Sequence, residues 1–272
     1  MNSQKKQIIW ANTIVNDEEN FIWFAIMSVI DYVDKILVWD TGSADKTVEI
    51  IKEIQKIKPD KIIFKKVGEV DKNAFTRMRQ KMLDQSTSDW ILILDGDEIW
   101  WEESIKSLVN KINKDGDRID GIVVPMVVPV GDIYHLQEES AGKYQLLNKK
   151  GHYSLRAINK KIPKLHVDLP YGQEGYYDSN NLPVQERKKI VFLKAPYLHT
   201  THLKRSSLKD KNIKFKYEIG NHVPPKFEFP EVMYRSFPNN VPSPWIRLSG
   251  SERTRAILLT PLRRMKRKIL ND

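Results

Sequence analysis

Asp95 and Asp97 stand two residues apart directly after the apolar run ILIL, with Gly96 between them. Extended residues two apart point the same way, so the two carboxylates converge, and Gly96 lets the backbone turn and a ligand approach. Paired carboxylates suit a hard cation such as Mg²⁺ or Mn²⁺, which neutralises a diphosphate leaving group. The pattern therefore predicts a metal-bound diphosphate. The alternative is that both acids cap a helix that starts near Trp101.

A third carboxylate, Asp40, ends another apolar run, KILVW, and is followed by the turn-forming residues TGS. A carboxylate in this position can accept a hydrogen bond from a base N–H or a ribose hydroxyl. Asp45 and Thr47, a few residues later, are typical of a helix start and are interpreted as structural.

These acids must be positioned by a regular framework, and the first hundred residues predict one. Apolar runs typical of buried strands alternate with segments of helical periodicity, which favours an α/β fold with a mostly parallel sheet and helices on both faces. Ligands of such sheets lie at the carboxyl ends of the strands, where Asp40 and Asp95 both fall. The predicted strands are 8–15, 35–39, 61–65 and 90–94, and the predicted helices are 18–32, 45–56, 73–86 and 102–113.

The second half is less regular. Residues 121–130 (GIVVPMVVPV) read as a strand, in which Pro125 and Pro129 indicate edges or bulges. Short strands and loops are expected from 134 to 198. The Pro- and aromatic-rich segment 220–247 is expected to be extended and to pack on the surface.

Composition narrows the class of protein. The chain has 272 residues, 40% of them hydrophobic, and no cysteine, so disulfides and thiolate metal sites are excluded. No apolar stretch reaches the roughly 20 residues of a membrane-spanning helix. The N-terminal apolar run is short and ends in acids, unlike a secretory signal. We therefore expect a cytoplasmic protein.

The net charge is +10, and half of it lies at the C-terminus. Residues 251–272 contain seven Lys or Arg against two acids, which gives 7 − 2 = +5, and they are interspersed with leucines and other apolar residues. Such a segment can lie on an anionic membrane surface, which would make the protein peripheral at the inner face of a membrane. A disordered solubilising tail is the alternative, and Pro261 is expected to break or restart a helix here.

Four ordered motifs together resemble glycosyltransferase family 2, whose members have the GT-A fold. They cover about the first 105 residues. The third motif departs from the family pattern because Gln80 replaces an Asn after Arg79. The motifs are the opening strand and turn at 13–18 (TIVNDE), the DxGSxDxT segment at 40–47, the stretch 75–80 (FTRMRQ) and the DxDE strand at 90–98.

The resemblance implies a reaction and roles for particular residues. A sugar would pass from a nucleoside-diphosphate sugar to an acceptor hydroxyl, with inversion at the anomeric carbon and with Mn²⁺ or Mg²⁺ as cofactor. Glycan or lipid-linked acceptors are expected, as in cell-surface glycan synthesis. The donor-side residues would be Thr13 and Val15 near the base, Asp40 on base or ribose, Arg79 on the nucleotide, Asp95 and Gly96 at the ribose or metal, and Asp97 on the metal.

An inverting transfer also needs a general base on the acceptor side. The candidates among the later acids are Glu138, Glu139, Asp168, Glu174 and Asp178. Asp168 and Glu174 rank first because they lie in KLHVDLPYGQEGYYD, whose tyrosines suit stacking on a sugar.

The segment YLHTTHLKR, residues 197–205, holds the remaining candidates. Some GT-A enzymes add a late His to the metal and a Lys or Arg to the diphosphate. His199 and His202 are both candidate metal ligands, and Lys204 and Arg205 are candidate diphosphate ligands. Hydrogen-bonded histidines near the core and solvated cations are the alternatives.

Three other functions are alternatives to this interpretation. A HAD-like phosphatase also has a strand that ends in DxD, with Asp95 as nucleophile, but that motif prefers Thr or Val where Ile99 stands and usually occupies the first strand. A nucleotidylyltransferase would need a Gly-rich phosphate loop near the N-terminus. A nucleic-acid-binding protein would use the basic surface, but zinc spacings and RNP-like motifs are missing, and we expect no nucleic-acid partner.

The expected domain organisation follows from these motifs. Residues 1–205 form the predicted GT-A domain, with 1–105 as the nucleotide-binding half and 106–205 as the acceptor half. Residues 206–272 form an irregular C-terminal extension that ends in the basic amphipathic tail.

Overall fold

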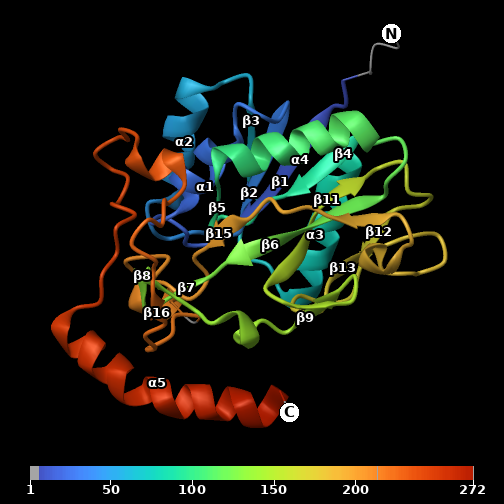
Figure 1. The fold of residues 1–272 in the computed structure, drawn as a ribbon. Helices are drawn as coiled ribbons and strands as arrows, with labels where there is room; N and C mark the ends of the chain where they lie inside the picture. The colour runs from blue at the N-terminus through green and yellow to red at the C-terminus, as the bar shows by residue number, and fades with distance from the viewer. Residues whose placement is uncertain (1–5, 213, 272) are drawn as a thin grey trace.

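The structure, a computed structural model, describes residues 6–212 and 214–271 and shows a central twisted sheet with helices on both faces (Figure 1). Four of the described α-helices belong to the first half of the chain, and the fifth ends it. The helices are α1 (Ile22–Val29), α2 (Thr47–Ile57), α3 (Lys72–Gln85), α4 (Glu102–Asp115) and α5 (Gly250–Asn271), and the 3-10 turns are η1 (Glu139–Ala141), η2 (Val184–Glu186), η3 (Lys209–Lys211) and η4 (Glu231–Tyr234).

The main sheet runs in the order β3-β2-β1-β4-β11-β6-β15-β5, with β14 paired beside β6. The pairs β3–β2, β2–β1, β1–β4, β6–β14 and β6–β15 are parallel, whereas β11 and β5 are antiparallel to their neighbours. Its strands are β1 (Ile9–Val15), β2 (Lys35–Asp40), β3 (Ile62–Lys66), β4 (Trp90–Ile93), β5 (Glu98–Trp100), β6 (Gly121–Val127), β11 (Tyr153–Asn159), β14 (Ile190–Phe192) and β15 (Tyr197–His199). The expectation of an α/β fold with a mostly parallel sheet is confirmed, and the sheet is mixed because β11 and β5 are antiparallel.

Smaller ribbons flank this sheet. They are formed by β9 (Tyr144–Leu146) with β10 (Lys149–Gly151), by β12 (His166–Asp168) with β13 (Gly175–Tyr177), and by β7 (Pro129–Val130), β8 (Asp132–Leu136) and β16 (Asn221–His222).

Alternating side chains of β2 explain why helices cover both faces. Ile36 and Val38 pack into the core cluster that contains α1 and α2, whereas Leu37 and Trp39 pack against Met78 of α3 on the opposite face. Because both faces are buried, the strand is apolar at every position after Lys35 until it reaches Asp40.

The parallel register brings the ends of β1, β2 and β4 to one edge of the sheet. Val15 lies opposite Asp40, and Leu94, just beyond β4, donates its N–H to the carbonyl of Asn12 across 3.2 Å. The chain leaves β4 after Ile93, turns through residues 95–97, and enters β5 at Glu98. The acids predicted at strand ends therefore share one edge.

Strand β6 contains Pro125 although it lies inside the sheet. On one side it pairs with β11, and on the other side β14 pairs with residues 121–123 and β15 with residues 126–127. Pro125 falls in the gap between those two partners, where its missing N–H breaks no ladder. Pro125 was expected at a sheet edge or bulge. It instead lies inside the sheet, between the parts of β6 that pair with β14 and with β15.

The tail is helical, and α5 runs through Pro261 without ending there (Figure 1). Ala256 is fully buried against the body, and Thr260 accepts the N–H of Ile219 across 2.8 Å. Pro261 removes one internal hydrogen bond of the helix, and these contacts stabilise α5 despite that loss. The break expected at Pro261 is therefore absent. Within the described residues, no helix combines the length and apolar character needed to cross a bilayer.

Candidate donor-binding and metal site

Gly96 lets the acidic turn pack tightly against the end of β1. A Cβ atom at this position would lie 3.2 Å from Cγ1 of Val15 and 3.0 Å from Cγ of Glu18. A larger residue at this position would therefore have to displace the side chains of Val15 and Glu18 by a few tenths of an ångström. Val15, expected near the base, is 1% exposed beneath this turn.

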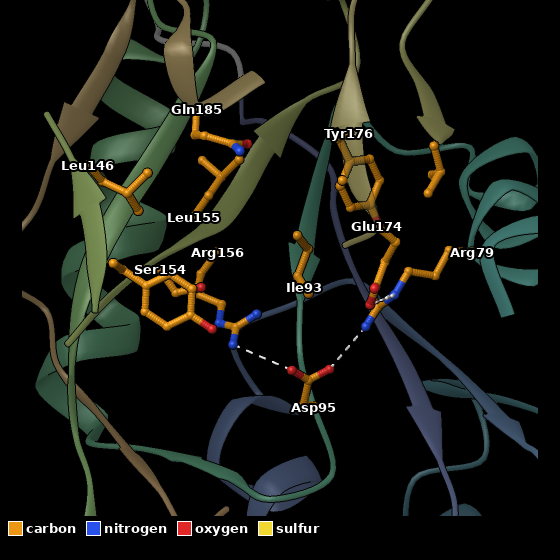
Figure 2. Close-up of a pocket in the computed structure, with 13 residues that line it drawn as sticks. Arg79, Ile93, Asp95, Leu146, Ser154, Leu155, Arg156, Glu174, Tyr176 and Gln185 are labelled. Carbon is orange, nitrogen blue, oxygen red and sulfur yellow. Dashed lines mark hydrogen bonds and ion pairs between the residues drawn. The ribbon is translucent and has the colours of Figure 1, made fainter. Parts of the chain in front are cut away.

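Asp95 lies between two arginines from different elements (Figure 2). Oδ1 is 3.3 Å from Nη2 of Arg79 in α3, and Oδ2 is 3.4 Å from Nη2 of Arg156 in β11. Burial raises the pKa of Asp95, but Arg156 and Arg79 outweigh that effect and lower it. Asp95 is therefore ionised near neutral pH and keeps about a third of its side chain exposed.

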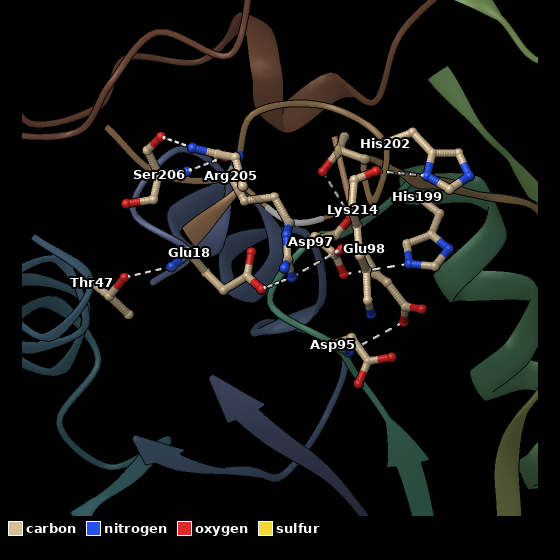
Figure 3. Close-up of polar contacts among 12 residues, drawn as sticks. Glu18, Thr47, Asp95, Asp97, Glu98, His199, His202, Arg205, Ser206 and Lys214 are labelled. Carbon is tan, nitrogen blue, oxygen red and sulfur yellow. Dashed lines mark hydrogen bonds and ion pairs between the residues drawn. The ribbon is translucent and has the colours of Figure 1, made fainter. Parts of the chain in front are cut away.

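Asp97 contacts a second group of cations (Figure 3), so the expectation that the two carboxylates converge is wrong. Its Oδ1 is 3.5 Å from Nε2 of His199, and its Oδ2 is 3.7 Å from Nη1 of Arg205. Burial opposes ionisation, but His199, Arg205 and Lys214 lower the pKa of Asp97. Burial lowers the pKa of His199, and the facing Asp97 carboxylate raises it above the ordinary value.

Strand pairing explains how His199 reaches this turn. Strand β15 runs antiparallel to β5, and His199 lies directly opposite Glu98. The next residue, Thr200, donates its N–H to the carbonyl of Asp97 across 2.9 Å. His199 is thus fixed to the acidic turn by backbone hydrogen bonds as well as by its ring.

Glu98 stabilises the acidic turn through its buried carboxylate. Its fully buried carboxylate pairs with Arg156, and its Oε2 accepts the backbone N–H of Asp95 across 3.3 Å. Burial raises the pKa of Glu98 to about 7, although Arg156 partly offsets that effect. Arg156 in turn donates from Nε to the hydroxyl of Tyr197 across 3.1 Å.

Three residues of this cluster were not predicted to be functional. Glu98 is visible in the sequence as the last residue of DxDE, and Arg156 is a lone cation in the apolar strand YSLRAIN. Lys214 had no usable signal, because it is one of several lysines in KDKNIKFKYE. Its ammonium extends toward the carboxylates (Figure 3), and although burial lowers its pKa, Tyr171 and Asp97 raise it.

The other residues expected to contact the nucleotide lie at the same edge of the sheet, and most of them are buried. Thr13 is fully buried, and its hydroxyl has no hydrogen-bond partner among the described residues. Asp40 is 2% exposed and accepts the backbone N–H groups of Gly42 and Ser43, each across 3.2 Å. Asp40 therefore shapes the TGS turn.

A cavity of about 280 Å³ opens beside Asp95 (Figure 2). Glu174 lies in it, with Oε1 4.0 Å from Nε of Arg79. Asp168 does not line it: its exposed carboxylate accepts the N–H of Leu169 and borders a separate cavity along α3. The 280 Å³ cavity is lined by Arg79, Ile93, Asp95, Tyr144, Leu146, Ser154, Leu155, Arg156, Val167, Glu174, Gly175, Tyr176 and Gln185.

His202 and Lys204 have partners other than the acidic turn. The Nδ1 atom of His202 is 3.3 Å from the carbonyl of Lys214, and its Nε2 is 2.7 Å from Nζ of Lys216. Lys204 pairs with Glu252 of α5. Of the predicted late residues, His199 and Arg205 are the two that face Asp97.

The residues present fit a divalent cation that is also held by a substrate. Among the described residues there is no group of three or more His, Asp or Glu side chains arranged around a metal position. Mn²⁺ and Mg²⁺ bound with phosphates need only one or two protein ligands, because the phosphate oxygens and water complete the shell. Asp97 and His199 supply such a pair.

Comparison with known proteins agrees with this geometry. The model of the family described as "Glycosyl transferase family 2" matches residues 13–168, more than half of the chain. The chain belongs to glycosyl transferase family 2. The match covers Thr13, Asp40 and Asp95, and it argues against the alternative of a HAD-like phosphatase. The expectations of the family and of its GT-A fold are confirmed.

A curated relative shows how far the likeness in sequence extends. The SPbeta prophage-derived glycosyltransferase SunS of Bacillus subtilis is 30% identical over 194 residues, which cover 67% of this chain and 43% of SunS. The chain thus spans less than half the length of that relative.

Solved structures are more distant. TarS 1–349 of S. aureus is 15% identical with a TM-score of 0.47, over 71% of this chain and 60% of that one. Glucosyl-3-phosphoglycerate synthase from Mycobacterium tuberculosis, solved with Mn²⁺ and UDP, is 16% identical with a TM-score of 0.42, over 71% and 72% of the two chains.

Proposed function

We propose that this protein is a metal-dependent inverting glycosyltransferase that moves a sugar from a nucleoside-diphosphate sugar to an acceptor hydroxyl. The observation that carries the proposal is the divergence of Asp95 and Asp97 from one turn. Asp95 faces a cavity beside Arg79 and Glu174, and Asp97 faces His199 and Arg205. One turn can therefore serve the sugar on one side and the metal-bound diphosphate on the other.

On the donor side, Asp97 and His199 would hold Mn²⁺ or Mg²⁺, and Asp95 would contact the ribose or metal. The metal, when bound, neutralises the diphosphate and stabilises it as a leaving group. Arg205 and Lys214 would bind diphosphate oxygens, for which their approach to Asp97 places them well. Thr13, Val15, Asp40 and Arg79 would surround the nucleoside at the strand ends.

On the acceptor side, we assign the general base to Glu174 rather than to Asp168. The acceptor oxygen attacks the anomeric carbon, the bond from that carbon to the diphosphate oxygen breaks, and its electron pair leaves with the diphosphate. Glu174 receives the acceptor proton, and its pairing with Arg79 keeps it oriented toward the cavity. Tyr144 and Tyr176 in the cavity wall can pack on a sugar ring.

The acceptor we propose is a glycan or lipid-linked acceptor, reached from the inner face of a membrane. Support comes from α5, whose outer face exposes a stripe of Leu258 (70% exposed), Leu262 (58%), Met265 and Ile269. Exposed cations, among them Lys266 and Lys268, flank this stripe. A stripe of apolar side chains bordered by lysines is complementary to an anionic lipid surface.

A thermal-shift screen tests the donor side of the proposal. UDP-, GDP- and dTDP-sugars are each added with and without Mn²⁺, and the melting temperature is measured. We expect at least one donor to stabilise the protein in a Mn²⁺-dependent manner, and Asp97→Ala to abolish that dependence. If none of the donors shifts the melting temperature, the proposal fails.

A further inference from the structure

A short segment, residues 214–219, connects the donor site to the C-terminal helix and is called the strap below. At its first residue, the side chain of Lys214 extends toward the acidic turn that carries Asp97 (Figure 3). The strap therefore supplies a cation to the place where the proposed diphosphate would bind.

The other end of the strap is fixed by α5 through a buried ion pair. Glu218 is fully buried, and Arg267 of α5 donates from Nη1 to its Oε2 across 2.9 Å and from Nη2 to its Oε1. Arg267 also donates from Nη2 to Oε1 of Glu138 across 2.6 Å. A buried carboxylate with two charge-assisted bonds depends strongly on its partner, because without it the charge is left uncompensated.

Further contacts along α5 hold the middle and the end of the strap. The guanidinium of Arg255 lies 4.1 Å from the ring centroid of Tyr217. Thr260 accepts the N–H of Ile219 across 2.8 Å, and Arg264 donates to the carbonyl of Ile219 across 3.4 Å. The helix thus contacts three consecutive residues of the strap.

The strap also contacts the body of the protein beside His202 and beside Gly131. Lys216 donates its N–H to the carbonyl of His202 across 3.3 Å, and its ammonium meets the ring of the same histidine. Near Glu218 the strap lies so close to Gly131 that a Cβ there would stand 2.1 Å from the carbonyl oxygen of Glu218. Within the strap, Glu218 forms the ion pair with α5.

We propose that α5 is a positioning element of the donor site, in which Arg267 acts through Glu218 to set where Lys214 meets the donor diphosphate. This inference rests on the proposed function. Lys214 contacts the ligand, whereas Arg267 and Glu218 are positioning residues. Donor affinity is then controlled in part by a helix that lies outside the nucleotide-binding half of the chain.

A double-mutant cycle tests the coupling. The ligand is the nucleoside diphosphate, UDP, GDP or dTDP, that binds the parent protein in the presence of Mn²⁺, and its Kd is measured by calorimetry. Lys214→Gln should raise Kd about tenfold, the effect of losing one charge-assisted hydrogen bond. Arg267→Gln should raise Kd in the parent but have little further effect in Lys214→Gln.

Two further variants keep the result interpretable. Arg253→Gln removes an exposed cation from the same helix and should leave Kd unchanged. If Arg267→Gln does not fold, Thr260→Val enters the cycle in its place, because it removes only the hydroxyl that Ile219 donates to.

The outcomes separate this inference from the proposed function. The positioning role of α5 is overturned if the two substitutions change Kd by independent factors, or if Arg267→Gln binds as tightly as the parent. The proposed function would stand in either case. A parent protein that binds none of the three nucleoside diphosphates overturns the proposed function and this inference with it.

Discussion

His199 faces Asp97 with 3.5 Å between its Nε2 atom and the carboxylate Oδ1, and the antiparallel pairing of β15 with β5 fixes this geometry. A neutral imidazole and a carboxylate at this separation can both turn toward one cation. The pair joins the first half of the chain to its later half. His202, three residues on, has both ring nitrogens engaged elsewhere.

His199→Ala should weaken Mn²⁺ binding in the presence of nucleoside diphosphate. Removal of a residue that hydrogen-bonds to a metal ligand typically lowers metal affinity roughly 10–100-fold. Loss of the ligand itself should lower the Mn²⁺ affinity by at least as much. Calorimetric titration of Mn²⁺ measures it. His222→Ala, on the outlying strand β16, is the matched control and should bind Mn²⁺ as the parent does. Equal Mn²⁺ affinity in the parent and His199→Ala would exclude His199 as a ligand.

Glu174→Gln should lower kcat by about 10²–10⁴-fold, the usual contribution of a general base. Donor affinity should change much less, because the amide keeps the shape of the side chain beside Arg79. Asp168→Asn is the matched control, since its carboxylate is exposed and lies outside the cavity. Steady-state kinetics with a competent acceptor distinguishes them. A larger loss of kcat in Asp168→Asn would reverse the assignment of the base.

Glu98→Gln should change how stability depends on pH. Burial raises the pKa of Glu98 from 4.5 to about 7, so between those values the folded state binds more protons than the unfolded chain. The free energy of unfolding of the parent therefore falls, as far as this residue contributes, when the pH rises from about 4.5 to about 7. The variant lacks this loss and should gain stability relative to the parent over that range.

Urea unfolding of both proteins at several pH values between 4.5 and 8 measures this difference. A difference in the free energy of unfolding that stays constant across the range would show that Glu98 does not carry a raised pKa in the folded protein.

The first half of the chain was predictable because its signals are local. Strand β4 is apolar throughout and ends one residue before Leu94, so its pattern predicted both the strand and the position of Asp95. Boundaries shifted where a single residue intervened: the predicted helix 18–32 starts only at Ile22 of α1, after Asp17 adopts a φ of 54°. Such a left-handed conformation cannot be inferred from helical periodicity alone.

The acceptor side was less predictable because it depends on contacts between distant segments. Glu174 and Asp168 belong to one hairpin and look equivalent in sequence. Asp168 pairs with Gly175 at the end of β12, Glu174 precedes β13, and of the two acids only Glu174 lines the cavity beside Asp95. Arg156 reaches Asp95 because β11 returns beside β4. Neither relation follows from spacing along the chain.

Leu262→Ser should weaken binding of the protein to vesicles of phosphatidylglycerol and phosphatidylcholine by about tenfold, since burial of one leucine contributes about 1.5–3 kcal/mol. Binding of the parent should also fall with increasing salt. Vesicle co-sedimentation measures both effects. Ser251→Ala, at the start of α5, changes no apolar contact of the stripe and should bind as the parent does. Membrane binding by Leu262→Ser equal to the parent's would contradict the role of the stripe.

The most direct test of the donor site is a calorimetric titration of the nucleotide sugar selected by the thermal-shift screen into the parent protein and into Asp97→Asn. Asn keeps the size of the side chain but removes the charge that faces His199 and Arg205. We predict that the parent binds the donor much more tightly with Mn²⁺ than without it, and that Asp97→Asn binds it weakly and equally in both conditions. A variant that retains the parent's Mn²⁺-dependent affinity would contradict the account of this turn as the metal-bound donor site.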